Sequence, residues 1–311
     1  MGIVFGVFRE AYLKSSISSE HSLGINACSL EWDSLLKELS KFSSIDNLEI
    51  ADGDYSAFDR SHDPSDLWSL FDIIESWYET YFPNNVDFNI RKTLFECVVH
   101  CPIVLRDNVF SMVRGQPSGW YMTTVINNLT NKLNYRYCFY RTLQENGMHL
   151  NKEFRDFVSL NVHGDDSLFS VREDFKEYFN MLKVPIYMSE LGFKITPAAK
   201  ENDIEKPFLP LKDVQYLKRS FRYEPFLGYY IGPLTMETVN ETLQWTSRKS
   251  PEQTFIDNIN ASLREVALHG RTQYEDFVRK VRLALIECCP RTIIERVNLP
   301  SWTSMMEEIF F

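Results

Sequence analysis

The segment Val162–Ser167 restricts the fold of this chain more than any other. It contains Gly164-Asp165-Asp166 and lies between two runs, 157–162 and 167–171, whose composition is typical of β-strands. Two such runs joined by a short polar turn predict a β-hairpin with both aspartates at its tip. Adjacent carboxylates repel each other, so their convergence is costly unless a cation lies there. The segment alone is also typical of a solvated turn, and the rest of the chain has to decide between the two.

Length and composition are those of an ordinary globular protein. The chain has 311 residues, of which 44% are hydrophobic and 24% are charged, and this length suggests about two domains. No apolar run approaches the roughly 18 residues that span a bilayer, and no signal peptide opens the chain. The net charge of −10 argues against a simple electrostatic grip on nucleic acid. Any such function would need a local basic patch or parts outside this chain.

The six cysteines form no recognisable metal or disulfide framework. They are Cys28, Cys97, Cys101, Cys138, Cys288 and Cys289. His100 lies between Cys97 and Cys101, but no second pair of ligands follows at zinc-finger spacing. We therefore expect free thiols in a reducing compartment.

The residues before the central hairpin predict one strand, several helices and another hairpin. Residues 1–44 are expected to be irregular except for a helix at 30–39; then come a strand at 48–54, helices at 63–81, 85–101 and 120–146, and a hairpin at 102–113. The first half of the last helix carries Thr124, Asn128 and Asn131 among other β-branched and amide residues. This is poor helix composition, which indicates that something other than helix propensity selected it.

The residues after the central hairpin are expected to be mostly helical. We expect a helix at 173–190 that is interrupted at Pro185, a strand from 191 that leads to a loop ending at Lys200, a tight hairpin at 214–223, and helices at 235–247, 251–269, 272–288 and 300–310. The order of elements predicts an α+β fold, in which an antiparallel sheet is flanked by helices and a mostly helical region follows.

An antiparallel sheet could bring together two carboxylates that are far apart in the sequence. Asp54 ends the 48–54 strand, and Asp165 lies at the hairpin tip. Two-metal phosphoryl transfer needs such a pair, with ions roughly 3.5–4 Å apart. A calcium loop fits the first segment poorly, because Ala57 stands where glycine is required and Asp63 where a bidentate glutamate is required.

Motifs in this order resemble those of picorna-like viral RNA-dependent RNA polymerases. Asp54-x4-Asp59 resembles motif A, Ser118-Gly119-x3-Thr123-x3-Asn127 motif B, Gly164-Asp165-Asp166 motif C, the segment 191–200 motif D and the segment 217–222 motif E. Each motif alone is weak or moderate, whereas their joint order is specific. The resemblance implies a right-hand polymerase fold with residual fingers at 1–45, a palm at 46–222 and a helical thumb at 223–311.

The resemblance assigns the acidic residues and one lysine to catalysis. Asp54 and Asp165 would be the principal ligands of two Mg²⁺ ions, for which Mn²⁺ can substitute, and Asp166 would assist them, because hard cations need carboxylate oxygens. Lys200 resembles a lysine proposed to protonate the pyrophosphate that leaves.

The resemblance also assigns nucleotide and primer contacts. Recognition of the ribose would fall to Asp59, Ser118, Thr123 and Asn127, and Gly119 would let the loop approach the nucleotide closely. Primer phosphates would be held by Lys218, Arg219 and Arg222. The alternative is that these three side chains are only part of a solvated surface.

The implied function is synthesis of RNA on an RNA template and primer from ribonucleoside triphosphates, replicating a viral genome. His163 stands where the family usually has tyrosine, and nothing in residues 1–50 resembles the basic motif F that cradles the triphosphate. We therefore expect the chain to be a C-terminal part of a larger polyprotein, with the missing fingers region as a partner, and to be a poor polymerase alone. A genome-linked protein primer and a location at virus-induced membranes in the host cytoplasm, through other viral proteins, are further expectations.

Three alternatives remain open on the sequence. A truncated or genome-integrated remnant would keep the fold without independent catalysis. A reverse transcriptase shares the palm, although Ser118 and Asn127 favour ribonucleotides. A metal-dependent nuclease or phosphatase would share the carboxylates but has no use for the ribose-recognising set.

Overall fold

The computed structural model describes residues 2–84, 86–196 and 206–311, and the chain forms two compact units. The first unit comprises Met1–Gly24 and Glu38–Leu211, and the second comprises Ile25–Lys37 and Lys212–Phe311. The division into expected fingers, palm and thumb segments stays a prediction. None of the helices in the described residues is long and apolar enough to cross a membrane.

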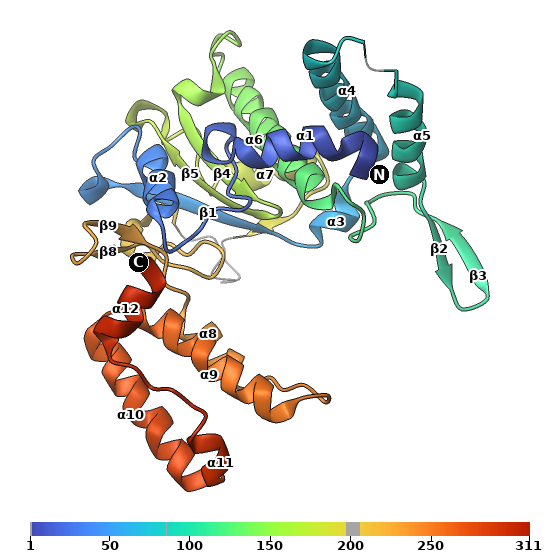
Figure 1. Cartoon of the computed structure of the whole chain (residues 1–311). Helices are drawn as coiled ribbons and strands as arrows, with labels where there is room; N and C mark the ends of the chain where they lie inside the picture. The colour runs from blue at the N-terminus through green and yellow to red at the C-terminus, as the bar shows by residue number, and fades with distance from the viewer. Residues whose placement is uncertain (1, 85, 197–205) are drawn as a thin grey trace. The chain divides into compact units, whose positions relative to one another are not determined.

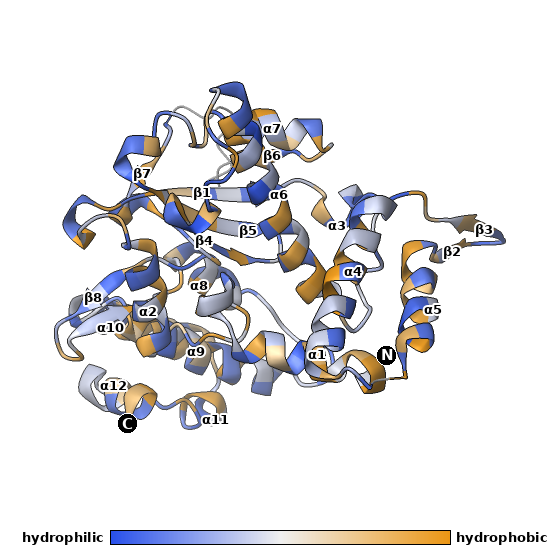
Figure 2. Ribbon diagram, turned by 90° about the horizontal axis from the view of Figure 1, so that it is seen from above, coloured by the Kyte–Doolittle hydropathy of each residue, from blue (hydrophilic) through white to orange (hydrophobic). Residues whose placement is uncertain are grey.

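The first unit is organised around an antiparallel sheet with strand order β4-β5-β1-β6, in which β7 also pairs with β1. Figure 1 labels β1, β4 and β5, and Figure 2 also labels β6 and β7. The strands are β1 (Glu49–Tyr55), β4 (Val158–His163), β5 (Asp166–Val171), β6 (Ile195–Thr196) and β7 (Leu209–Pro210). Strand β1 is central, with β5 on one side and both β6 and β7 on the other. The predicted central hairpin is confirmed, because β4 and β5 pair along their whole length, ending with His163 opposite Asp166.

Alternation along the strands determines which face of the sheet is covered by helices. In β4, Val158, Leu160 and Val162 belong to the same buried core as the inner side chains of α6 (Thr123–Glu145) and α7 (Val184–Glu190). The intervening residues are polar, as expected for side chains that point to the other face. The predicted antiparallel sheet flanked by helices is therefore confirmed.

A second core in this unit is made by helices. It joins α1 (Gly2–Lys14), α4 (Pro64–Tyr81) and α5 (Phe88–Val99) to the start of α6. The expectation of irregular structure before residue 30 was wrong, since Phe5, Phe8 and Tyr12 of α1 are buried at helical spacing. Glycines lower the helix propensity of this stretch, but burial of its apolar face stabilises the helix.

The expected elements between β1 and α6 are present. Helix α4 begins as predicted, because the Asp63 side chain accepts a hydrogen bond from the Ser65 N–H and Pro64 follows it. The short helix α3 (Phe58–Ser61) precedes it. Strands β2 (Pro102–Leu105) and β3 (Asn108–Ser111) form the expected hairpin, which is exposed along its length and projects away from the sheet with apolar side chains (Figures 1 and 2).

The expectation of a single helix at 173–190 was wrong. A 3₁₀ turn, Glu173–Phe175, is followed by turns, and α7 begins only at Val184. The Asn180 side chain bonds the Lys176 carbonyl at 2.8 Å and the Leu182 N–H at 3.0 Å, which replaces helical pairing. Pro185 thus starts a helix instead of interrupting one. Of the expected motif D strand, the described residues contain only β6.

The second unit is mostly helical, as predicted. It contains part of α2 (Leu30–Leu39), a hairpin of β8 (Arg222–Glu224) with β9 (Tyr229–Ile231), and the helices α8 (Met236–Thr242), α9 (Pro251–Ala267), α10 (Arg271–Cys288), α11 (Arg291–Ile294) and α12 (Trp302–Phe310). Helix α11 and strand β9 were not predicted. Of the tight hairpin expected at 214–223, only the turn is present, since Tyr216 pairs with Arg219 around two residues with positive φ, and Arg222–Glu224 pairs with β9 instead.

A buried ion pair joins α4 to α5 and yields a stability prediction. Arg91 donates to both carboxylate oxygens of Glu75, at 2.6 and 2.5 Å. We expect Glu75→Gln to lower the free energy of unfolding by about 3 kcal/mol, because it leaves a buried guanidinium uncompensated. Urea denaturation would measure the change. Glu173→Gln, which removes an exposed partner of Lys176, is the control and should change stability by less than about 0.5 kcal/mol. Equal effects would contradict the prediction.

Candidate functional site

The tip of the central hairpin is a two-residue loop, Gly164 and Asp165, between the paired His163 and Asp166. Gly164 has a φ of +65°, a left-handed conformation that glycine adopts without strain. It is buried, whereas Asp165 is exposed and Asp166 is partly buried. The hairpin therefore anchors its glycine in the protein and presents the first aspartate to solvent.

The sheet brings the other predicted carboxylate beside this tip. Gly53 lies opposite Ser167 in the pairing of β1 with β5, so the register continued by one residue brings Asp54 opposite Asp166. Residues opposite each other in an antiparallel pair have Cα atoms roughly 4.5–5.5 Å apart and side chains on one face. On the other side of β1, Asp54 pairs with Thr196. Asp54, Asp165 and Asp166 thus gather at one end of the sheet.

The chemistry of these donors fits a divalent cation. Carboxylate oxygens on neighbouring strands repel each other, and a hard cation such as Mg²⁺ relieves that repulsion. Within residues 2–84, 86–196 and 206–311, no group of three or more His, Cys, Asp or Glu side chains is gathered closely enough to hold a metal. The observation that fits an ion is therefore the pairing of β1 with β5 and the adjoining loop, which places the three aspartates at the same end of the sheet. The complete ligand set stays a prediction.

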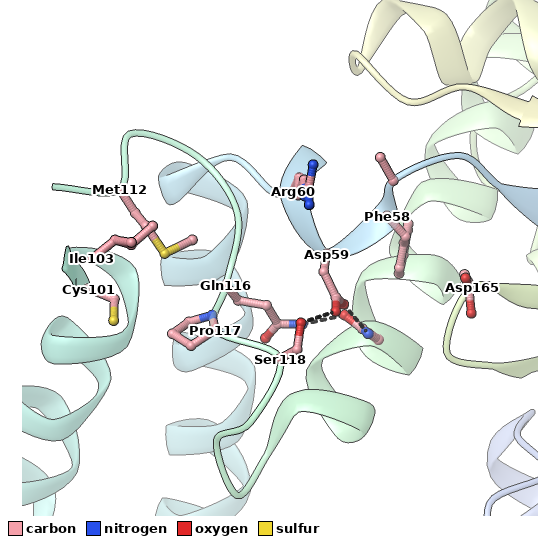
Figure 3. Close-up of a pocket in the computed structure, with 12 residues that line it drawn as sticks. Phe58, Asp59, Arg60, Cys101, Ile103, Met112, Gln116, Pro117, Ser118 and Asp165 are labelled. Carbon is pink, nitrogen blue, oxygen red and sulfur yellow. Dashed lines mark hydrogen bonds between the residues drawn. The ribbon is translucent and has the colours of Figure 1, made fainter. Parts of the chain in front are cut away.

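Asp59 is the centre of a hydrogen-bonded group next to this end of the sheet. It lies in α3, which begins directly after Ala57, where the chain turns with a φ of +56°. Its carboxylate accepts from the Ser118 hydroxyl and from the Asn127 side-chain amide, both at 2.7 Å (Figure 3). The structure therefore brings together three of the residues predicted to recognise ribose.

Two residues that the sequence did not reveal orient this group. The Asn127 Oδ1 lies 2.9 Å from His62 Nε2 and also accepts from the Gln116 side-chain amide. The Trp120 indole N–H donates to Gln116 Oε1 at 3.0 Å. Asn127 is thereby fixed with its carbonyl toward His62 and its amide toward Asp59. His62 is the residue that follows the last turn of α3, in extended conformation, and no local pattern in the sequence indicates its contact with Asn127.

The remaining motif B residues support the loop or lie at its surface. The Thr123 hydroxyl lies 2.9 Å from the Trp120 carbonyl and 3.1 Å from the Pro117 carbonyl. It therefore holds the loop that carries Ser118 and makes no described bond to Asp59. Gly119 is exposed, and a Cβ there would meet no atom within 4 Å.

A cavity of about 510 Å³ connects the Asp59 group with the hairpin tip. Its lining includes Asp59, Ser118, Asn127 and Asp165. Figure 3 shows Asp59 between Asp165 on one side and Gln116 with Pro117 on the other. The volume is in the range of small-ligand sites, roughly 300–1,000 Å³. Residues from β1–α3, the motif B loop, α6 and the hairpin thus face one space that could hold a nucleotide.

The basic residues of the predicted motif E lie in the second unit. Lys218 is exposed. Arg219 donates to Glu265 at 2.7 and 3.0 Å and to the Gly232 carbonyl at 2.6 Å, while Arg222 donates to Glu224 at 2.6 Å. Both arginines are thus engaged inside the unit, and their contact with primer stays a prediction. Lys200 lies outside the described residues.

Comparison with known proteins gives consistent matches. A family model described as viral RNA-dependent RNA polymerase matches residues 1–286. The replicase polyprotein of Drosophila C virus is 29% identical over 306 residues, covering 96% of this chain and 17% of the polyprotein. The genome polyprotein of Rice tungro spherical virus (strain Vt6) is 27% identical over 310 residues, covering 98% of this chain and 8% of the polyprotein. The chain therefore spans a small part of these relatives.

The fold is also similar to a solved structure. The Sicinivirus 3Dpol RNA dependent RNA polymerase superposes with a TM-score of 0.78 at 17% identity. The match covers 98% of this chain and 59% of that one. At this identity the likeness establishes the fold, and it agrees with the predicted sheet flanked by helices and followed by a helical region.

The buried His62 yields a prediction about pH. Burial lowers the pKa of its imidazole, against the opposing effects of the Asn127 hydrogen bond and the Asp59 charge. Because the folded pKa lies below the unfolded one, stability is full above about pH 6.5 and falls as the pH drops toward the folded pKa. His62→Gln keeps an N–H donor and removes the titration. Wild type should therefore lose more stability than His62→Gln between about pH 7 and pH 5.

Urea denaturation at several pH values would measure this difference. An equal pH dependence of the two proteins would contradict a neutral, buried His62.

Proposed function

Since the chain belongs to the family of viral RNA-dependent RNA polymerases, we propose that it forms the catalytic core of a polymerase that replicates a viral RNA genome. The reaction is template-directed transfer of nucleotides from ribonucleoside triphosphates to an RNA 3′-hydroxyl. The single observation that carries this proposal is the convergence of Asp59, Ser118, Asn127 and Asp165 on one cavity. Its relatives are polyproteins, so the active enzyme is proposed to be a longer chain.

The hydrogen-bonded group around Asp59 is suited to recognise a ribose. A 2′-hydroxyl both donates and accepts a hydrogen bond, and it needs partners of both kinds. The Asp59 carboxylate would accept a hydrogen bond from it, and the Asn127 amide or the Ser118 hydroxyl would donate one to its oxygen. Without a nucleotide these groups satisfy one another, at 2.7 Å each. Binding would therefore exchange existing hydrogen bonds for new ones and leave no polar group unpaired.

The carboxylates at the end of the sheet would hold the metals. When bound, two Mg²⁺ ions would lower the pKa of the 3′-hydroxyl and neutralise the charge of the departing pyrophosphate. Asp54 and Asp165 are the proposed principal ligands, and Asp166 assists. Lys200 would donate a proton to the leaving group, and Lys218 would contact primer phosphate without reading sequence.

The partners and location are part of the same proposal. RNA template, RNA primer and ribonucleoside triphosphates would bind this chain together with the fingers region of its polyprotein. A genome-linked protein could act as primer, and replication would take place at membranes in the host cytoplasm through other viral proteins. Metabolic labelling of nascent RNA in infected cells, with detection of the chain by antibody, would test the location. Absence of the chain from labelled sites would contradict it.

The catalytic role of Asp165 can be tested by primer extension. The polymerase region of the polyprotein that contains this chain should extend a primed RNA with ribonucleoside triphosphates and Mg²⁺. Asp165→Asn should slow nucleotide addition by at least about 10³-fold, since a metal ligand stabilises transition-state charge by several kcal/mol. Asp107→Asn, in the exposed turn of the β2–β3 hairpin, is the matched control and should be fully active. Similar activity of both variants would refute the proposal.

Ribose recognition gives a second test. Asp59→Asn removes the carboxylate that is proposed to accept from the 2′-hydroxyl. The ratio of kcat/KM for a ribonucleotide to that for its 2′-deoxy analogue should fall by at least about tenfold, because a site built around a hydroxyl loses its discrimination when that partner is lost. Asp63→Asn, which alters the cap of α4, should leave the ratio unchanged. An unchanged ratio in Asp59→Asn would contradict this role.

A further inference from the structure

Two buried asparagines of α6 grip the backbone at the tip of the central hairpin. Asn128 and Asn131 are both 0% exposed, and their spacing of three places them on one helix face. The Asn128 Oδ1 accepts the Gly164 N–H, and the Asn131 Nδ2 donates to the Gly164 carbonyl at 2.9 Å. Both backbone groups of one glycine are therefore bonded to side chains of a single helix.

The position of Gly164 explains why such partners are required. It is the first residue of a two-residue loop and lies outside the ladder formed by β4 and β5. Because it is buried, its N–H and carbonyl are shielded from water, and leaving either unpaired would be unfavourable. An asparagine side chain offers one acceptor and two donors, which an apolar side chain cannot do. This accounts for the amide-rich composition of α6 that helix propensity does not explain.

Packing alone does not explain Asn131. Its Oδ1 is buried without a hydrogen-bond partner among the described residues, and burying an unpaired polar atom is unfavourable. A leucine of similar size would fill the space without that cost. The amide at 131 is therefore retained for its bond to Gly164, and its effect must be sought in the turn that follows.

We propose that Asn128 and Asn131 are positioning residues that fix the Gly164 peptide units and thereby set the direction in which Asp165 and Asp166 project. Asn127, which directly precedes Asn128 in the same helix, bonds Asp59. Helix α6 thus ties the ribose-recognising group to the carboxylate turn. The role of the turn in placing metal ligands rests on the proposed function. The clamp, by which we mean the hydrogen bonds of Asn128 and Asn131 to Gly164, does not depend on that function.

The clamp can be measured without catalysis. In the full 311-residue chain, Asn128→Leu and Asn131→Leu should each speed amide hydrogen exchange at Gly164 by about five- to tenfold, because each variant removes one hydrogen bond that holds this residue. Exchange would be followed residue by residue by NMR. Asn134→Leu is the matched control, since it removes another buried amide one turn further along α6 and should leave the Gly164 amide protected.

Metal affinity is the second measurement. Titration with Mn²⁺ alone, followed by water proton relaxation, should show about tenfold weaker binding in Asn131→Leu and unchanged binding in Asn134→Leu. Substitution of residues that orient metal ligands commonly costs 10–100-fold in affinity. A general loss of structure would weaken both variants equally, so the difference between them isolates positioning.

Isosteric variants keep the test decisive if a leucine variant fails to fold. Asn128→Asp retains the acceptor for the Gly164 N–H and should keep Gly164 protected, whereas Asn131→Asp loses the donor to the Gly164 carbonyl and should speed exchange at Gly164. Unchanged exchange in both leucine variants, or equal exchange in the two aspartate variants, would overturn the inference. If wild type binds no Mn²⁺, the proposed function fails, and the exchange rates still decide whether the clamp exists.

Discussion

The first unit has to hold the carboxylates of Asp54, Asp165 and Asp166 at one end of the sheet in spite of their mutual repulsion. The register of β1 with β5 brings Asp54 next to Asp166, and the hairpin loop adds Asp165. Like charges at such positions destabilise a sheet, so the surrounding structure must be stable enough to hold them there. That stability comes from the apolar face of the sheet, where side chains of α6 and α7 share one buried core with those of β4 and β5. The core is therefore the support for an arrangement that would not form alone.

Helix α6 serves two purposes through different faces. Its inner face, including Tyr135 and Phe139, is fully buried against the sheet. Its first turns instead carry amides that bond Asp59 and Gly164. Low helix propensity in these turns is tolerated because tertiary contacts hold the helix. The part of α6 with low helix propensity is thus the part that faces the candidate site, as is expected where chemistry takes precedence over stability.

Much of this arrangement follows from local patterns in the sequence, and the rest depends on contacts between distant residues. The central hairpin and the start of α4 were predictable because turn and capping chemistry act over a few residues. Helix α1 was not, since two glycines obscure an apolar face that only packing reveals. The helix expected at 173–190 failed because the side chain of Asn180 satisfies the backbone locally. No local pattern signals that His62 and Gln116 converge on Asn127.

The negative net charge of the chain is consistent with a site built from carboxylates and amides. Several arginines are committed to internal ion pairs, including Arg219 with Glu265 in the second unit and Arg136 with Glu20 in the first. In such a pair the positive charge of the guanidinium is balanced by a neighbouring carboxylate. What this chain would contribute to the proposed polymerase is then the arrangement of side chains around Asp59 and Asp165. Because Asn127 and Asn128 are consecutive in α6, that geometry is set at both places by one rigid element.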